Sequence, residues 1–234
     1  MTDDTRAPST LSRLREVVGM APRAFRGFGH LGPRGPIDGP PCLVLPGFIA
    51  TDRTAMELRR AFAAAGWRTY GWNQGLNRGA RVDTINRLTE RLAAIAPDGP
   101  PVLVVGWSLG GVFARELARA EPDRIAGVVT LGSPFSGDPR WNNVWRLYER
   151  VAGHPVDRPP VARNPAKPPV PTLALWSRRD GLIAPRAAYG LEEERDAAVE
   201  LGCTHMGFAV SRTGTRAVTA ATRAFLIERG LPVP

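Results

Sequence analysis

Ser108 lies in a sequence context that can turn a hydroxyl group into a nucleophile. It is the centre of Gly106-Trp107-Ser108-Leu109-Gly110, which follows the apolar run 101–105 and precedes the helix-forming segment 112–118. A strand, a sharp turn and a helix make a nucleophile elbow, whose strained backbone lifts the central side chain above the end of the sheet. Glycines two positions to either side relieve the crowding in this turn, and Gly111 lets the helix sit close to the strand. The pattern predicts that Ser108 attacks a substrate carbonyl carbon.

A serine nucleophile needs a base, which is usually a histidine oriented by a carboxylate. The chain has three histidines. His30 precedes every predicted strand and His154 lies among turn residues, whereas His205 directly follows the last predicted strand. Active sites of parallel α/β sheets form at the carboxyl ends of the strands. We therefore predict that His205 is the base.

The acid is expected between Ser108 and His205, because the order Ser, acid, His accompanies a nucleophile elbow of this kind. Asp180 comes directly after the fifth predicted strand, and we predict that its carboxylate orients His205. Asp180-Gly181 is also an ordinary turn signal. Asp138, after the fourth predicted strand, is the alternative acid.

The transition state of acyl transfer carries negative charge on the former carbonyl oxygen and needs fixed hydrogen-bond donors. The backbone N–H of Leu109, directly after the nucleophile, is the first predicted donor. The second is the backbone N–H of Phe48, in the loop Pro46-Gly47-Phe48 that follows the first predicted strand.

Strands and helices alternate along the chain from about residue 41. Apolar runs predict strands over 42–45, 67–72, 101–105, 124–131, 170–176 and 197–201, and amphipathic patterns predict helices over 55–62, 82–95, 112–118 and 215–229. Thr51 or Asp52 is a plausible N-cap of the first of these helices. The alternation predicts a parallel sheet with right-handed crossovers and helices on both faces.

Residues 136–169 interrupt this alternation at the predicted active-site edge. An apolar and aromatic stripe predicts a helix there, with Leu147 and Val151 packing it onto the body of the protein, and a proline-rich linker follows. We interpret the insertion as a lid or pocket wall, with a surface helix packed on the core as the alternative. The residues expected to line an acyl pocket are Trp107, Trp141, Trp145 and Tyr148.

The first 40 residues are set apart from the α/β domain, which we place at 41–234. Residues 10–20 predict an amphipathic helix with a basic side, and glycine and proline dominate 27–41, as in a linker. A helix packed on the domain is favoured, and weak contact of its basic side with a membrane surface is the alternative.

Composition excludes several classes of protein. The chain has 234 residues, 43% of them hydrophobic and 23% charged, which is typical of a globular protein with one domain. The net charge of +9 comes almost entirely from scattered arginines, without a basic block interleaved with aromatics, so nucleic-acid binding is not expected. The two cysteines predict reduced structural thiols. Neither a membrane span nor a secretory core is recognisable, so a cytoplasmic location is expected.

These pieces together resemble the α/β-hydrolase superfamily over roughly residues 41–230, and most closely compact bacterial esterases and lipases with a triacylglycerol-lipase-like pattern. The matching segments are 45–48, 106–111, 131–135, 180–185 and 204–207. The resemblance implies a reduced hydrolase fold, with a mostly parallel sheet of about six strands. It also implies hydrolysis of a small-molecule carboxylic ester through an acyl-enzyme, without cofactor or metal. The chain departs from the family pattern at Pro46 and Trp107, where many relatives have histidine.

Two other functions compete with ester hydrolysis. A thioesterase or acyltransferase would use the same acyl-enzyme and differ only in the group that enters or leaves. A non-catalytic hydrolase-fold protein would only bind a ligand or a membrane surface. The complete set of Ser108, Asp180 and His205 in the expected order argues against the latter, because a binding protein does not need all three.

Overall fold

The protein is described by a computed structural model that covers residues 4–8, 16, 32–161 and 163–234. Of the helix predicted over 10–20, only Glu16 is among these residues, and the rest of that prediction lies outside them. Within the described residues no helix is long and apolar enough to cross a membrane. Cys42 and Cys203 are both free thiols.

The described strands form one sheet in the order β2-β1-β3-β4-β5-β6, and each of its neighbouring pairs is parallel. The strands are β1 (Pro41–Leu45), β2 (Arg68–Gly71), β3 (Val102–Trp107), β4 (Ile125–Leu131), β5 (Thr172–Trp176) and β6 (Ala197–Glu200). Every residue of β1 and β3 is buried, as expected for strands covered by helices on both faces. The predicted parallel sheet of about six strands is confirmed.

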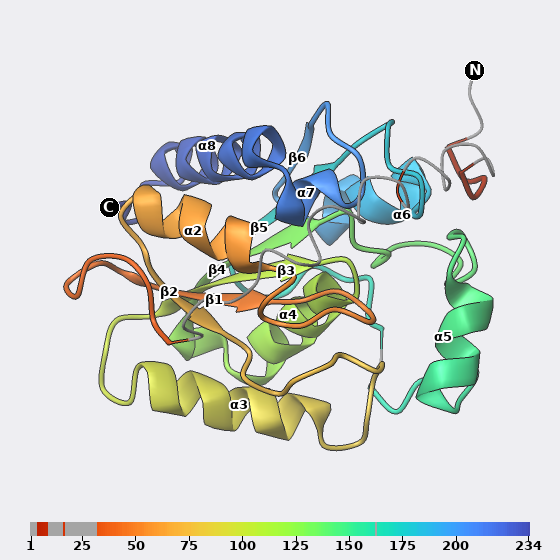
Figure 1. The fold of residues 1–234 in the computed structure, drawn as a ribbon, viewed down its shortest axis with the longest axis horizontal. Coiled ribbons are helices and arrows are strands. Elements are labelled where there is room, and N and C mark those ends of the chain that lie inside the picture. Colours follow the sequence, from red (N-terminus) through yellow and green to blue (C-terminus); the bar gives the residue numbers. More distant parts are fainter. Residues whose placement is uncertain (1–3, 9–15, 17–31, 162) are drawn as a thin grey trace.

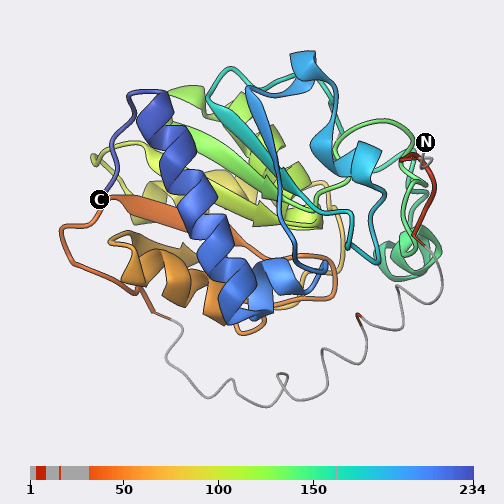
Figure 2. The same cartoon turned by 90° about the horizontal axis from the view of Figure 1, so that it is seen from above.

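Helices cover both faces of the sheet. Figure 1 shows α2 and α8 above it and α3 below it, and Figure 2 shows α8 running across the upper layer. The upper helices are α2 (Met56–Ala64), α7 (Gly207–Val210) and α8 (Arg212–Glu228), and the lower ones are α3 (Thr84–Ile95) and α4 (Leu109–Ala120). Phe62 and Phe225 lie in the upper core, and Leu88 and Phe113 in the lower one.

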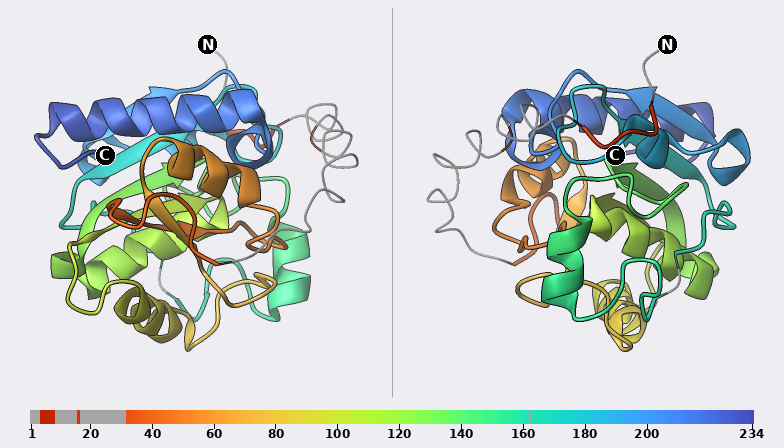
Figure 3. Two further views of the ribbon diagram at one scale, coloured as in Figure 1. Left: turned by 60° about the vertical axis from the view of Figure 1, so that its left-hand side comes forward. Right: turned by 90° about the vertical axis from the view of Figure 1, so that its right-hand side faces the viewer.

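The segment between β4 and β5 carries a helix that stands away from both layers. This helix is α5 (Trp145–Ala152), and the right-hand view of Figure 3 looks onto the end of the molecule where it lies. The short α6 (Pro185–Tyr189) follows β5 near the same end (Figure 1). The segment between β4 and β5 thus contains α5, while its role as a lid or pocket wall stays a prediction.

The predicted cap of α2 is wrong. This helix begins at Met56, and its N-cap residue Ala55 makes no side-chain capping bond. The carboxylate of Asp52 instead accepts hydrogen bonds from the backbone N–H groups of Trp72 and Asn73, at 2.9 Å each. Asp52 thus ties the loop after β1 to the end of β2. A capping pattern could not show this, because the donors lie 20 and 21 residues further along the chain.

Candidate active site

Ser108 occupies a strained turn between β3 and α4. Its φ of 55° and ψ of −122° lie outside the usual regions for a residue with a side chain. A Cβ atom on Gly106 would overlap the backbone of Gly110, and one on Gly111 would overlap the hydroxyl of Ser133. The Ser108 N–H donates to the carbonyl oxygen of Leu131 at 2.8 Å, which fixes the turn to the end of β4. The glycines therefore have the steric role that the motif predicts.

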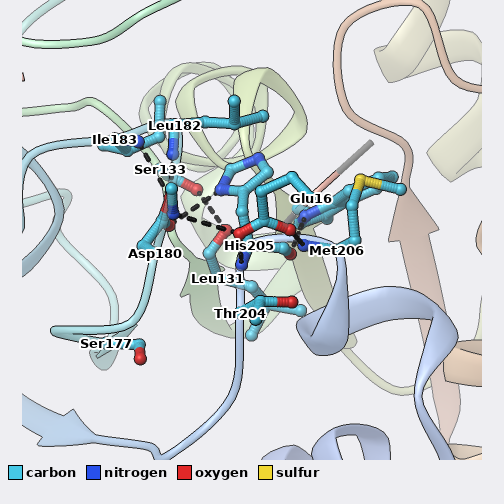
Figure 4. A network of polar contacts seen from close by, with 12 residues as sticks. Glu16, Leu131, Ser133, Ser177, Asp180, Leu182, Ile183, Thr204, His205 and Met206 are labelled. Carbon is cyan, nitrogen blue, oxygen red and sulfur yellow. Dashed lines mark hydrogen bonds and ion pairs between the residues drawn. The ribbon is translucent and has the colours of Figure 1, made fainter. Parts of the chain in front are cut away.

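Asp180 and His205 form a buried pair at the same edge of the sheet. The imidazole Nδ1 of His205 lies 2.8 Å from Oδ2 of Asp180 (Figure 4). The other carboxylate oxygen of Asp180 accepts hydrogen bonds from the N–H groups of Leu182 and Ile183, at 2.8 Å each. These bonds fix the carboxylate, so Nδ1 of His205 carries the hydrogen and Nε2 is left to accept a proton.

The alternative acid is not placed to orient His205. Asp138 is exposed, and its Oδ1 accepts a hydrogen bond from the backbone N–H of Arg140 at 2.7 Å. His154 lies within the insertion, where its Nε2 is 3.1 Å from the carbonyl oxygen of Ala80. Of the two carboxylates considered from the sequence, only that of Asp180 contacts His205.

The surroundings of His205 change its basicity. Burial alone would lower the pKa of His205, because it disfavours the charged imidazolium. The charge and hydrogen bond of Asp180, with a further contribution from the Glu16 charge, outweigh burial and raise the pKa. The site thus stabilises the imidazolium that a general base becomes when it takes a proton.

Ser108 lies on the wall of an apolar cavity. The residues around the cavity are Phe48, Ala80, Ser108, Leu109, Val112, Phe113, Pro134, Pro139, Asn142, Val144, Trp145, Tyr148, Val156, Pro159, Val161, Arg163 and Ile183. Trp145 and Tyr148 come from α5, so the insertion forms one side of the cavity. The Phe48 and Tyr148 rings pack against each other with centroids 5.3 Å apart. Such a cavity fits an apolar acyl or alcohol group next to the Ser108 hydroxyl.

Two of the residues expected to line this cavity, Trp107 and Trp141, are not part of its wall. Trp107 is buried beneath His205, and its indole N–H donates to the His205 carbonyl oxygen at 3.1 Å. Trp141 precedes α5 and packs against the cluster around Ile183.

Leu147 and Val151 are 43% and 39% exposed, so the prediction that they pack α5 onto the body is wrong. Tyr148 takes the inward face of α5 instead, and its hydroxyl accepts a hydrogen bond from the N–H of Ala80 at 3.2 Å.

The loop that carries Phe48 lies directly beside Ser108. A Cβ atom on Gly47 would be 3.1 Å from Cβ of Ser108, so only glycine permits this approach without movement. Leu109 is the first residue of α4, where a backbone N–H has no acceptor within its own helix. Among the described residues the N–H of Phe48 has no hydrogen-bond partner either. Both N–H groups are thus available for the predicted oxyanion hole.

Sequence reasoning missed a residue that holds this loop. The buried side chain of Asn77 donates to the carbonyl oxygen of Pro46 at 2.9 Å, and the Asn77 carbonyl oxygen accepts from the N–H of Ile49 at 2.7 Å. Its only sequence signal was a loop rich in glycine and asparagine after β2.

In the described part of the chain no hydrogen bond joins the Ser108 hydroxyl to His205, so proton transfer between them stays a prediction. The described residues also contain no group of three or more His, Cys, Asp or Glu suited to a metal ion.

Comparisons with known proteins agree with this fold. A family model described as the alpha/beta hydrolase fold matches residues 40–155. The pimeloyl-[acyl-carrier protein] methyl ester esterase of Sodalis glossinidius (strain morsitans) is 39% identical over 72 residues, which is 30% of this chain and 27% of that protein. The protein of the same name from Serratia marcescens is 35% identical over 77 residues, 32% of this chain and 28% of that protein. The matches thus span less than a third of these relatives.

Solved structures show the same architecture at low sequence identity. Carboxylesterase CesB from Bacillus subtilis has a TM-score of 0.58 at 14% identity, covering 93% of this chain and 99% of that one. A membrane phospholipase A has a TM-score of 0.61 at 16% identity, with 93% and 91% covered. A structure from work on two metagenome-derived lipolytic enzymes, LipS and LipT, has a TM-score of 0.60 at 14% identity, with 85% and 98% covered. At these identities the likeness concerns the fold.

Proposed function

This chain has the α/β-hydrolase fold, and we propose that it is a serine hydrolase that cleaves carboxylic esters through an acyl-enzyme. One observation carries the proposal. The strained turn at Ser108 and the buried Asp180–His205 pair lie at one edge of the sheet, beside an apolar cavity that reaches Ser108. The curated relatives carry the name of methyl ester esterases, which supports the same reaction class.

In the first half of the reaction Ser108 Oγ attacks the ester carbonyl carbon while Nε2 of His205 takes the hydroxyl proton. The carbonyl oxygen becomes an oxyanion, and the backbone N–H groups of Phe48 and Leu109 stabilise it. When the tetrahedral intermediate collapses, the bond from carbon to the alcohol oxygen breaks and His205 gives its proton to the departing alcohol. The acyl group stays on Ser108.

The second half of the reaction repeats these steps with water. His205 takes a proton from a water molecule whose oxygen attacks the acyl carbon, and the bond to Ser108 Oγ then breaks. The proton on His205 returns to Ser108, and the carboxylic acid leaves. Throughout, the Asp180 carboxylate keeps the imidazole oriented and stabilises its charged form.

The cavity favours an apolar substrate. Most of its lining is aliphatic or aromatic, and Arg163 is its one charged lining residue in the described part of the chain. The Arg163 guanidinium already donates to the carbonyl oxygens of Pro134 and Ser136, at 3.0 and 3.2 Å. We therefore assign the cavity to an apolar acyl chain, and the names of the curated relatives favour a small alcohol as leaving group.

The test is hydrolysis of p-nitrophenyl esters from acetyl to palmitoyl, with matched thioesters, by the wild type and by Ser108→Ala. We expect ester hydrolysis by the wild type, loss to background in the variant, and labelling of Ser108 by a fluorophosphonate probe. Ser211→Ala is the matched control, because its hydroxyl caps α8 and its removal costs about 1 kcal/mol of stability without touching the site.

Each alternative function gives a different result. A strong preference for thioesters would identify a thioesterase. A folded wild type that hydrolyses none of the substrates and takes up no probe would indicate a non-catalytic binding protein. Labelling at another serine, or full activity in Ser108→Ala, would refute the proposed nucleophile.

A further inference from the structure

We propose that Glu16 is a positioning residue of this active site, whose carboxylate holds together the loop of Asp180 and the loop of His205. The proposal rests on the proposed function, since it assigns Glu16 a role in the same reaction. Glu16 precedes the sheet by some 25 residues, and no motif in the sequence connects it with the site.

The contacts of Glu16 reach both loops. Its Oε1 accepts hydrogen bonds from the backbone N–H of Gly181 at 3.0 Å and from that of His205 at 2.7 Å. Its Oε2 accepts a hydrogen bond from the N–H of Met206 at 2.9 Å. Figure 4 shows the Glu16 carboxylate against the His205 loop. One side chain thus joins the residue after the acid to the base itself and to the residue after the base.

Burial makes these bonds strong and their loss costly. Glu16 is 3% exposed, and a buried carboxylate is tolerated only where hydrogen bonds replace its water. Hydrogen bonds from backbone N–H groups to a carboxylate are charge-assisted and stronger than neutral ones. Removal of the carboxylate would also leave the buried N–H groups of Gly181 and His205 and the half-buried one of Met206 without this acceptor, so both loops would have to rearrange.

A second described part of the N-terminal region, residues 4–8, is linked to the same loop through Asn143. The side-chain N–H₂ of Asn143 donates to the carbonyl oxygen of Pro8 at 2.7 Å and to that of Gly181 at 3.1 Å. The N–H of Arg186, in α6, donates to the carbonyl oxygen of Asp4 at 3.0 Å. Figure 1 shows this piece of chain beside α6. Two separate parts of the N-terminal region are therefore linked to the loop that carries the acid, Glu16 directly and Pro8 through Asn143.

The charge of Glu16 also acts on the base. Among the described residues, the charges that shift the pKa of His205 are those of Asp180 and Glu16, and both raise it. Cys203, on the same loop as His205, has a pKa raised to about 12, mainly by burial, and carries no charge near neutral pH. A neutral residue in place of Glu16 would therefore lower the pKa of His205. A scaffolding role without proximity to the base would leave that pKa unchanged.

The experiment compares Glu16→Gln and Glu16→Ala in the full chain, with Glu193→Gln as the matched control on an exposed 3₁₀ turn. Glu16→Gln keeps the volume of the side chain, but its amide nitrogen can only donate, so it loses the charge and at least one hydrogen bond. Ester hydrolysis is followed as kcat, KM and the pH profile of kcat/KM. The pKa of His205 is measured by NMR titration, which does not depend on activity.

For Glu16→Gln we expect kcat to fall about 10- to 100-fold at nearly unchanged KM, because a displacement of about 1 Å can cost 10²-fold. The acid limb of kcat/KM and the NMR titration of His205 should both move to lower pH than in the wild type. Glu16→Ala should lose more activity with the same direction of shift. Glu193→Gln should match the wild type in rate and in both titrations.

An unchanged His205 titration together with wild-type kcat in Glu16→Gln would overturn the positioning role. A lower melting temperature with unchanged kcat and unchanged titration would also overturn it, because the residue would then only stabilise the fold. If the wild type itself hydrolyses no ester, the proposed function fails. The NMR shift would still report whether Glu16 acts on His205.

Discussion

At the residue scale, backbone strain is concentrated around Ser108. In the described chain the residues other than glycine with positive φ are Ile49 at 55°, Asn73 at 59° and Ser108 at 55°. A β-branched residue such as Ile49 rarely adopts this conformation, and each such residue costs on the order of 1–3 kcal/mol. Ile49 directly follows Phe48, so strain occurs in both segments that carry the proposed oxyanion donors. Bonds from Ser108 to β4 and from Ile49 to Asn77 hold these turns in place.

The acid assignment gives a residue-scale prediction. Asp180→Asn should lower kcat by about 10⁴-fold, the size of the effect of the same change in a serine protease, because an amide favours the wrong tautomer of His205. Asp138→Asn removes an exposed carboxylate that caps a neighbouring N–H, and it should change kcat less than twofold, in line with the neutrality of most surface substitutions. Both variants are compared by kcat on the best ester of the panel. A larger loss in Asp138→Asn would show that the acid has been assigned wrongly.

At the element scale, α5 presents different residues to the cavity and to solvent. Trp145 and Tyr148 are three residues apart and line the cavity, whereas Leu147 and Val151 are four apart and lie on an exposed side. Trp145 also carries the guanidinium of Arg146 over its ring, at 4.3 Å from the centroid. The inward residues therefore limit the space beside Ser108, and the outward ones do not reach it.

This arrangement predicts that Trp145→Ala shifts the preferred p-nitrophenyl ester to a longer acyl chain, because removing the indole enlarges the cavity. The melting temperature should change little, since Trp145 is not part of either main core cluster. Leu147→Ala, on the same helix, should alter neither the chain-length profile nor the melting temperature. A large drop in melting temperature with an unchanged profile in Trp145→Ala would make α5 part of the core.

At the scale of the whole molecule, stability depends on two cores, one on each face of the sheet. Phe225 of α8 is 4% exposed and lies in the upper core, which also contains side chains of α2, β3, β4 and β5. Phe225→Ala should lower the free energy of unfolding by about 3–5 kcal/mol, through lost burial and the cavity left behind. Ile227, two residues on and 56% exposed, is the control, and its change to alanine should stay within about 0.5 kcal/mol.

Urea denaturation at constant pH gives the free energy of unfolding of both variants. Their midpoints are compared only if the free energy falls with urea concentration at the same slope in both. Comparable losses of unfolding free energy in the two variants would mean that α8 does not pack on the sheet through Phe225. Because Phe225 lies in the second half of α8 and is none of the proposed site residues, folded Phe225→Ala should retain the wild-type kcat on the ester panel.

The sequence alone determined the elbow turn and the parallel sheet, and it proposed the order of the candidate site residues. Ser108 could be recognised because its glycines and flanking strand and helix lie within a few residues of it. Asp180 and His205 could be placed because each directly follows an apolar run, and parallel strands bring their carboxyl ends to one edge. These inferences use patterns that span only a few residues, namely short motifs and apolar residues that recur with the period of a strand or a helix.

Only the tertiary structure decided which side chains meet. It placed Asp52 on the end of β2, Trp107 beneath His205 and Leu147 in solvent. It also brought Glu16 to backbone groups 165 to 190 positions away in the chain. A local pattern shows that a face is apolar or that a carboxylate is present, but the partner is set by how distant elements pack. Contacts across such separations therefore leave no trace in residue spacing.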